Sequence, residues 1–356
     1  MRRWVFVLAV LAIAVALVAA FRGPLAMGAM SVMAPRIMSA NPMAEIPDGI
    51  QVTLCGAGSP LPDPQRSGPC VGVVAGGHLF VIDAGSASAR NLQGMGLPLS
   101  DVEAVFLTHF HSDHIDGLGE LSVLRWVAGA HQDPLALIGP PGVEDIAEGF
   151  NRAYRADARF RVAHHGEEVV PPSGKGLVGR PFSMPTSGQE VVVWDREGVR
   201  ITAFQVDHQP VEPAVGYRID YAGRSVVISG DTVRSPELER VAENADLLVH
   251  EALAAHLVAI MHATAKEAGM EGRAKVLNDI LDYHATPVDA AESASAAGVD
   301  HLLFYHVVPP LLVPGLPAAF LQGVSAAYDG DVTLGRDGTR VLLPAGSDDI
   351  EVSGGT

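Results

Sequence analysis

The run THFHSDHIDG at residues 108–117 constrains the fold of this chain more than any other segment. It follows residues 104–107, an apolar stretch with the length and composition of a buried strand, and it leads into a helical pattern at residues 117–128. Strand ends beside turns are where α/β folds build their sites. The sequence therefore predicts an α/β fold with a polar site in this turn.

Three histidines and an aspartate in this run have the chemistry of metal ligands. Imidazole and carboxylate groups bind zinc and similar ions, and a tight turn can aim His109 and His111 at one ion while Asp113 and His114 face another. The alternative is a polar turn that is rich in histidine by chance. Three histidines within six positions make chance a weak explanation, even in a chain with 14 histidines.

The rest of the chain alternates β-rich runs with helical stretches, which predicts a layered α/β architecture. Strands are expected at residues 51–55, 71–74, 79–83, 104–107, 135–138, 191–194, 200–206, 214–219, 225–229, 247–249 and 302–304. Helices are expected at residues 117–128, 143–154, 236–241, 252–268, 274–283, 287–297 and 317–328. Residues 169–189 predict a long loop, residues 50–345 one domain, and residues 346–356 a C-terminal tail.

Further residues of ligand type follow three other predicted strands: His208, Asp231 and His306. Taken singly, each has a simpler explanation. His208 suits a surface loop, Asp231 a turn or helix cap, and His306 a hydrogen-bonded core position. Their shared placement at strand ends favours one site with the run at 108–117.

A basic start and an apolar run mark the N-terminus. Residues 4–21 carry no charge and lie between Arg3 and Arg22, which predicts a signal peptide or a membrane anchor over residues 1–21. Residues 22–49 predict a tether. The alternative for the apolar run is a buried core helix. We expect a periplasmic or extracellular protein, in contact with the membrane through residues 4–21 if these are retained.

The charge argues against a polyanionic partner. The chain has 24 Lys and Arg against 41 Asp and Glu, a formal net charge of -17, whereas nucleic-acid binders present a basic face. Nucleic acid is therefore not the expected substrate. Cys55 and Cys70 would sit in an oxidising compartment, where a disulfide and two free buried thiols both remain open.

The histidine-rich run resembles the HxHxDH signature of the metallo-β-lactamase superfamily, and the resemblance covers roughly residues 50–320. Within it the chain resembles the ribonuclease Z-like branch through SGDT (229–232), HEAL (250–253), YHATPVDAA (283–291) and HLLFYH (301–306). It is also similar to exported arylsulfatases of the superfamily through GAGSPLPDPQRSGP (56–69) and FVIDAG (80–85). The resemblance implies a four-layer αβ/βα sandwich with the site at one edge of the sheets.

The resemblance also implies two Zn²⁺ ions and their ligands. One ion is expected on His109, His111 and His208, and the second on Asp113, His114 and His306, with Asp231 as the bridge. Asp83 and Asp116 are candidates to orient the ligand imidazoles, and each also suits a plain turn or cap.

Three further roles follow from the same resemblance. His284 is the expected general acid, partnered by Glu251, with Asp113 completing the catalytic set. The simpler explanations are a surface histidine at a helix end and a solvated glutamate at a helix start. Arg66 is the expected contact to the substrate anion, and a solvated loop arginine is the alternative.

Together these features predict an exported or membrane-tethered dinuclear zinc hydrolase of small anionic esters, with aryl sulfates as the first candidates and phosphodiesters as the next. In this mechanism a hydroxide that bridges the two metal ions attacks the ester. A ribonuclease Z-type endoribonuclease is an alternative. Ribonuclease Z enzymes carry a basic arm before the GDT motif, whereas residues 216–224 here run straight into residues 225–231. A β-lactamase and a non-catalytic binding protein on the same fold are further alternatives. The sequence leaves the oligomeric state open, with a homodimer as one form because related enzymes are often dimers.

Overall fold

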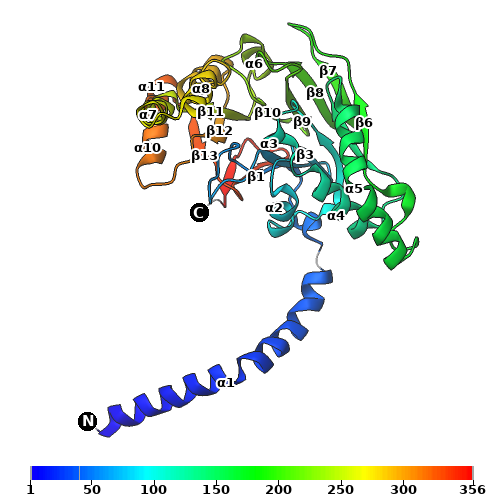
Figure 1. The fold of residues 1–356 in the computed structure, drawn as a ribbon, viewed down its shortest axis with the longest axis vertical. Coiled ribbons are helices and arrows are strands. Elements are labelled where there is room, and N and C mark those ends of the chain that lie inside the picture. The colour runs from blue at the N-terminus through cyan, green and yellow to red at the C-terminus, as the bar shows by residue number, and fades with distance from the viewer. Residues whose placement is uncertain (1, 40, 355–356) are drawn as a thin grey trace. The chain divides into compact units, whose positions relative to one another are not determined.

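The computed structural model describes residues 2–39 and 41–354, and the chain divides into two units between Glu45 and Ile46. The first unit contains α1 (Arg2–Ser39) and a 3₁₀ turn, η1 (Pro42–Glu45) (Figure 1). Among the described residues, no helix is both long enough and apolar enough to cross a lipid bilayer.

Residues 22–39, which we expected in an irregular tether, continue α1. Met and Ala dominate this stretch, and both are strong helix formers. Their propensity carries the helix past Pro24 and Pro35, each of which lacks the backbone N–H that a helix interior uses.

The second unit holds two mixed β-sheets. In the described chain one sheet has eight strands in the order β15-β14-β1-β2-β3-β4-β5-β6, and the other has seven in the order β13-β12-β11-β10-β9-β8-β7. The first sheet comprises β1 (Gly49–Gly56), β2 (Cys70–Ala75), β3 (His78–Ile82), β4 (Val102–Phe106), β5 (Leu135–Gly139), β6 (Leu177–Pro181), β14 (Arg340–Pro344) and β15 (Glu351–Ser353). The second comprises β7 (Val191–Arg196), β8 (Val199–Gln205), β9 (Val215–Tyr221), β10 (Arg224–Ile228), β11 (Leu247–Leu253), β12 (His301–Val308) and β13 (Asp331–Leu334).

The main apolar core lies between these sheets. Val73 and Phe106 of the first sheet and Tyr217 and Leu303 of the second are fully buried in it. Removing such a large apolar surface from water is the dominant favourable term in folding, so this core holds the two sheets together.

Helices cover the outer face of each sheet, which gives four layers and confirms the predicted α/β sandwich. The helices are α2 (Ser88–Gly94), α3 (Ser112–Ile115), α4 (Leu118–Gly129), α5 (Val143–His165), α6 (Pro236–Val241), α7 (Ala255–Glu267), α8 (Glu271–Asp279), α9 (Pro287–Ala297), α10 (Leu316–Phe320) and α11 (Val324–Ala327). Trp126 of α4 packs with Ala158 of α5 on the first sheet, and Leu238 of α6 packs with Ala290 of α9 on the second. Figure 1 shows α7, α8, α10 and α11 gathered at one end of this unit and α5 beside β6.

Two predicted irregular segments contain strands. β6 lies inside the expected loop at 169–189, where it pairs in parallel with β5, and β15 lies inside the expected tail, where it pairs with β14. Both are edge strands, so pairing with one neighbour creates them and their own sequences carry little alternation. The predicted helix at 317–328 is interrupted at Gly323, whose φ of 91° is left-handed.

Cys55 and Cys70 form a disulfide with a Cα–Cα distance of 4.9 Å. It joins the end of β1 to the start of β2, beside the register shift between Leu54 and Gly56. Of the two alternatives that the sequence left open, a disulfide or two free thiols, the structure thus shows the disulfide.

Parallel pairing fixes the edge at which a site forms. β3, β4 and β5 are mutually parallel neighbours in the first sheet, and β10, β11 and β12 in the second. The carboxyl ends of parallel strands meet at one edge, and the loops that follow them lie close together there.

Candidate metal centre

Seven side chains of ligand type converge at this edge. Their ligand atoms form two groups in which all atoms lie within 4.8 Å of one another: His109, His111 and His208 with Asp231, and Asp113 and His114 with His306. A third group of the same kind joins Asp231 and His306 with His284. The first two histidines follow β4, Asp113 and His114 lie in α3, and the others come from the ends of strands in the second sheet. The structure thus brings together all seven predicted ligand residues, in the grouping that the sequence suggested.

Asp231 lies between the two groups. Its Oδ2 is 3.8 Å from Nε2 of His109 and 3.8 Å from Nε2 of His208. On the other side it is 3.4 Å from Nε2 of His114 and 3.5 Å from Nε2 of His306. These separations are long for hydrogen bonds, but they suit pairs of ligands that each lie about 2.0–2.2 Å from one shared ion. Oδ2 of Asp231 therefore lies within 3.8 Å of a histidine nitrogen in each group.

Unpartnered buried atoms test whether the residues fit metal ions. Nε2 of His114, Oδ1 of Asp231 and Nδ1 of His306 are buried and have no hydrogen-bond partner among the described residues. Buried polar atoms are nearly always hydrogen-bonded, so several unpartnered ones in one cluster indicate that cations complete the site. A set dominated by imidazole with a few carboxylates suits zinc and similar divalent metals.

The protonation states of His109 and Asp231 suit cation binding, whereas His114 must lose a proton to bind a metal, because its burial is outweighed by Asp231 and Asp83, which raise its pKa well above the usual value. Burial, aided by the neighbouring His114, lowers the pKa of His109 well below its usual value. Burial would raise the pKa of Asp231, but His306 and His114 hold it well below the usual range. Neutral imidazole and ionised carboxylate are the forms that coordinate metals.

Asp83 anchors two of the ligand histidines. Its carboxylate accepts hydrogen bonds from the backbone N–H (2.9 Å) and hydroxyl (2.8 Å) of Thr108, and it lies 2.7 Å from Nδ1 of His114. The Thr108 hydroxyl lies 3.0 Å from Nδ1 of His109. These contacts leave Nε2 of each histidine facing the centre. Asp116, the other candidate for this role, is exposed, and no hydrogen bond of its side chain is found in the described chain.

Glu251 and His284 form a buried pair beside the centre. Oε1 of Glu251 lies 2.9 Å from Nδ1 of His284 and accepts hydrogen bonds from the backbone N–H of Thr232 (3.3 Å) and of Ala285 (3.1 Å). Glu251 belongs to β11 and is fully buried, so it is not the solvated helix start that was the simpler explanation. Burial would lower the pKa of His284, but the charge and hydrogen bond of Glu251, with Asp231, raise it to about 9.

Arg66 lies outside this cluster. Its guanidinium is buried, pairs with Asp63 at 3.3 Å and donates from Nε to the carbonyl oxygen of Gly335 at 2.9 Å. In the described chain no hydrogen bond or ion pair joins it to the seven ligand residues. The geometry therefore shows Arg66 holding the 56–69 loop against residue 335, with no contact to the predicted ligands.

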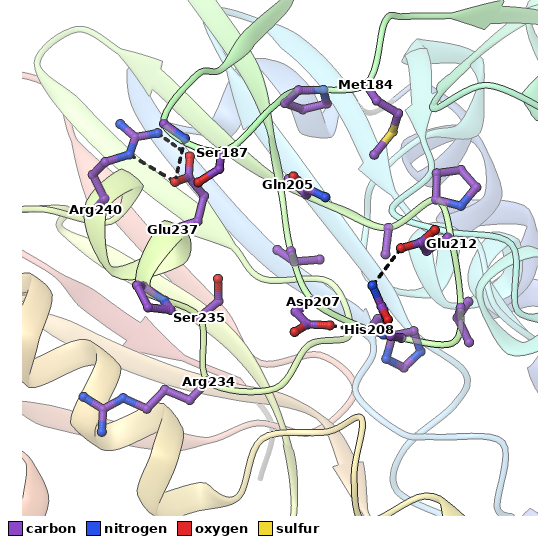
Figure 2. A pocket seen from close by; sticks show the side chains of 18 of the residues that line it. Met184, Ser187, Gln205, Asp207, His208, Glu212, Arg234, Ser235, Glu237 and Arg240 are labelled. Carbon is purple, nitrogen blue, oxygen red and sulfur yellow. Dashed lines mark hydrogen bonds and ion pairs between the residues drawn. The ribbon is translucent and has the colours of Figure 1, made fainter.

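A cavity of about 990 Å³ opens beside His208. Figure 2 shows His208, Asp207 and Glu212 at one side of it and Arg240 with Glu237 at another. Arg234 also lines it, and the wall includes Met184 and several prolines. His208 is the one candidate ligand residue among its described lining residues, so the cavity borders the candidate metal centre at this histidine.

Sequence reasoning missed Tyr283. Its ring centroid lies 4.8 Å from that of His208 and 4.8 Å from that of His284, and its backbone carbonyl oxygen is 2.8 Å from Nδ1 of His208. The available signal was an aromatic residue directly before the predicted general acid in YHATPVDAA. Nothing local in that run reveals that its ring contacts His208, in the segment that follows β8.

Comparison with known proteins gives both family and relatives. The Metallo-beta-lactamase superfamily model matches residues 64–294. Ribonuclease Z of Mycobacterium avium (strain 104) is 38% identical over 300 residues, which cover 84% of this chain and 100% of that protein. Ribonuclease Z of Mycobacterium marinum (strain ATCC BAA-535 / M) is 36% identical over 300 residues, covering 83% of this chain and 99% of that protein.

Solved structures agree on the fold. The metallo-beta-lactamase fold protein YhfI from Bacillus subtilis superposes with a TM-score of 0.60 at 20% identity, covering 82% of this chain and 99% of that one. Human tRNase Z, short form, superposes with a TM-score of 0.59 at 22% identity, covering 83% of this chain and 99% of that one. At such identities the likeness shows the fold alone.

These matches correct three predictions. The main prediction, an exported hydrolase of small anionic esters with aryl sulfates first, is wrong, because relatives that match over their whole length are named Ribonuclease Z, which was the stated alternative. The periplasmic or extracellular location, with membrane contact through residues 4–21, is contradicted by the same relatives, since it rested on the composition of one segment. The exclusion of nucleic acid rested on net charge, on the expected export and on the missing basic arm, and relatives named Ribonuclease Z argue against it. Net charge sums over the whole surface and does not describe one site.

Proposed function

Since this chain belongs to the metallo-beta-lactamase superfamily, we propose that it is a metal-dependent phosphodiesterase of the ribonuclease Z type that cleaves RNA. The observation that carries this proposal is the match, at 38% identity, to the full length of a protein named Ribonuclease Z. A complete set of ligand-type residues at one sheet edge supports it, because a chain that had lost hydrolytic function would not need to keep them.

The proposed ligands are the two groups that share Asp231. His109, His111 and His208 would hold one divalent cation, and Asp113, His114 and His306 a second. Bound cations supply Lewis-acid stabilisation of the charge on an attacked phosphate and lower the pKa of water toward neutrality. Asp83 keeps Nε2 of His114 and, through Thr108, of His109 turned toward the centre.

His284 is the proposed proton donor. Its ring lies 4.0 Å from Asp231 at Nδ1, and Glu251 holds that same nitrogen, so Nε2 is the atom free to give a proton to the leaving oxygen. Glu251 acts as a positioning residue, since its carboxylate also binds the backbone N–H of Ala285 and fixes the segment that carries His284. The raised pKa of His284, about 9, keeps the ring protonated near neutral pH.

The grip on RNA would differ from that of ribonuclease Z enzymes with a basic arm. β9 and β10 are joined by Ala222 and Gly223 alone, so no arm projects between them. The recognition of RNA would then depend on residues close to the scissile bond.

The test is cleavage of a 3′-extended precursor tRNA by the purified chain loaded with zinc. We expect release of the 3′ extension, loss of cleavage after chelation and its return on adding metal. His284→Asn should slow cleavage by about 10²- to 10⁴-fold, the usual contribution of a positioned proton donor. His165→Asn, at an exposed histidine at the end of α5, should leave the rate unchanged.

Measuring the metal content distinguishes a chain that is inactive because it lacks metal from a chain that is not a ribonuclease. A chain that binds two equivalents of metal, stays folded and leaves precursor tRNA and simple single-stranded RNA intact would overturn the ribonuclease proposal.

A further inference from the structure

Tyr283 lies beside both a proposed metal ligand, His208, and the proposed proton donor, His284. Its ring meets that of the ligand residue His208 at 89° and that of the proton donor His284 at 51°, each with centroids 4.8 Å apart. The ring of His111 lies 6.4 Å away. Any substrate that reaches both a metal on His208 and the proton on His284 must therefore pass close to this ring.

The exposure of Tyr283 distinguishes it from its neighbours. His208 is 1% exposed and the side chain of His284 is 8% exposed, whereas Tyr283 is only half-buried. In the described part of the chain its hydroxyl takes part in no hydrogen bond, and its only polar contact there is the backbone carbonyl that meets Nδ1 of His208. The backbone is thus fixed, while part of the residue stays open to solvent and to a ligand.

The two arginines on the wall of the cavity beside His208 are already engaged by carboxylates. Arg234 pairs with Glu239 at 2.7 Å, and Arg240 with Glu190 at 2.8 Å and with Glu237. Proteins that bind RNA through phosphates need free cationic groups, because counterion release supplies that affinity. Single-stranded RNA is otherwise held by stacking of its bases on aromatic side chains.

We propose that Tyr283 is a base-stacking residue that receives the nucleobase next to the phosphodiester that is cleaved. This inference rests on the proposed ribonuclease function and adds to it the part of the substrate that is recognised. The ring, and not the hydroxyl, carries the contact. Stacking on it would place the adjacent phosphate between His208 and His284, the two residues that the ring touches.

The test uses a 3′-extended RNA that the wild-type chain cleaves, with an intact base or an abasic residue on each side of the cut. Tyr283→Leu should raise KM for the intact RNA by about 5- to 150-fold, the range that base–aromatic stacking provides. Tyr283→Phe should stay within about twofold of wild type, because it keeps the ring. Tyr154→Leu, at a half-buried tyrosine of α5, should leave KM unchanged.

The abasic RNA allows a double-mutant cycle between the nucleobase and the Tyr283 side chain. With the wild-type chain, removal of the stacked base should raise KM by the same factor as Tyr283→Leu, and the two changes together should cost no more than either one. An unchanged KM for Tyr283→Leu, or an equal loss for Tyr283→Phe, would overturn the stacking role while leaving the ribonuclease proposal intact. A wild-type chain that binds metal and cleaves no RNA would overturn both.

Discussion

The carboxylate of Glu251 lies 2.9 Å from Nδ1 of His284, and Glu251 is fully buried. The two residues come from different elements, β11 and the segment before α9, and the contact makes the protonation of His284 depend on the charge of Glu251. Burial alone would lower the pKa of His284, whereas the charge and hydrogen bond of Glu251 raise it to about 9.

The first prediction concerns the pH dependence of RNA cleavage. If protonated His284 donates to the leaving oxygen, activity persists below its pKa and is lost as pH rises through about 9. Glu251→Gln removes the charge, so the pKa of His284 falls and the alkaline limb of kcat moves to lower pH. Rate–pH profiles of both proteins measure this, and Glu243→Gln, at an exposed glutamate, is the matched control. Coincident alkaline limbs would show that Glu251 does not govern the proton donor.

The second prediction concerns Asp231, the proposed bridging ligand. Asp231→Asn weakens the negative ligand that lies 3.4 Å from His114 and 3.8 Å from His109, so bound metal should fall by at least one equivalent. We expect activity to drop by about 10²-fold or more, as when one charge-stabilising group at a reaction centre is lost. Elemental analysis and RNA cleavage give the two readouts. Asp207→Asn, at an exposed neighbour on the cavity wall, should keep full metal content.

The third prediction separates Asp83 from Asp116. Asp83→Asn retains the shape of the side chain at a left-handed position, φ 56°, that asparagine tolerates. It weakens the contacts to His114 and Thr108, and metal affinity should fall about 10- to 100-fold. Competition with a chelator of known affinity measures the change. Asp116→Asn should match wild type, and equal losses in the two variants would contradict the assigned role of Asp83.

The fourth prediction concerns stability. Cys55 and Cys70 close a loop with a sequence separation of 15, and such a crosslink stabilises a fold by about 3 kcal/mol through the entropy of the unfolded chain. Cys55→Ala/Cys70→Ala should lower the free energy of unfolding by about this amount, measured by guanidinium denaturation. Wild type under strong reductant provides the comparison, and identical midpoints for oxidised and reduced wild type would rule out a stabilising bridge.

Several features of the site follow from residues that are near in sequence. The run at 108–117 places His109, His111, Asp113 and His114 in one turn because a short strand and a short helix flank it. Short, continuous apolar runs likewise predicted most strands, since strands buried on both faces need continuous apolar residues. The helices α6 and α9 were predicted with their observed bounds, because each begins with a proline at its first turn and ends where the apolar pattern stops.

Other features were decided only by tertiary contacts. The guanidinium of Arg66 pairs with its near neighbour Asp63 and with the carbonyl oxygen of Gly335, which is distant in the sequence. Arg66, which we expected to contact the substrate, is therefore tied to a loop. β6 forms because β5 offers a free edge, and the Gly- and Pro-containing segment around it has no strand pattern of its own. The ring of Tyr283 reaches His208 because β8 and the segment after α8 end at the same place.

By itself, then, the sequence determined which residues could bind metal and that the chain alternates strands and helices, because both depend on side-chain chemistry and spacing along the backbone. The family resemblance of the sequence already implied that Asp231 bridges the two ligand groups and that Glu251 partners His284. The tertiary structure alone decided that Arg66 is tied to Asp63 and Gly335 and that Tyr283 lies against both His208 and His284. The contacts of Gly335 and His208 join residues far apart in the sequence, and they exist only where packing of the two sheets brings the ends of separate elements together.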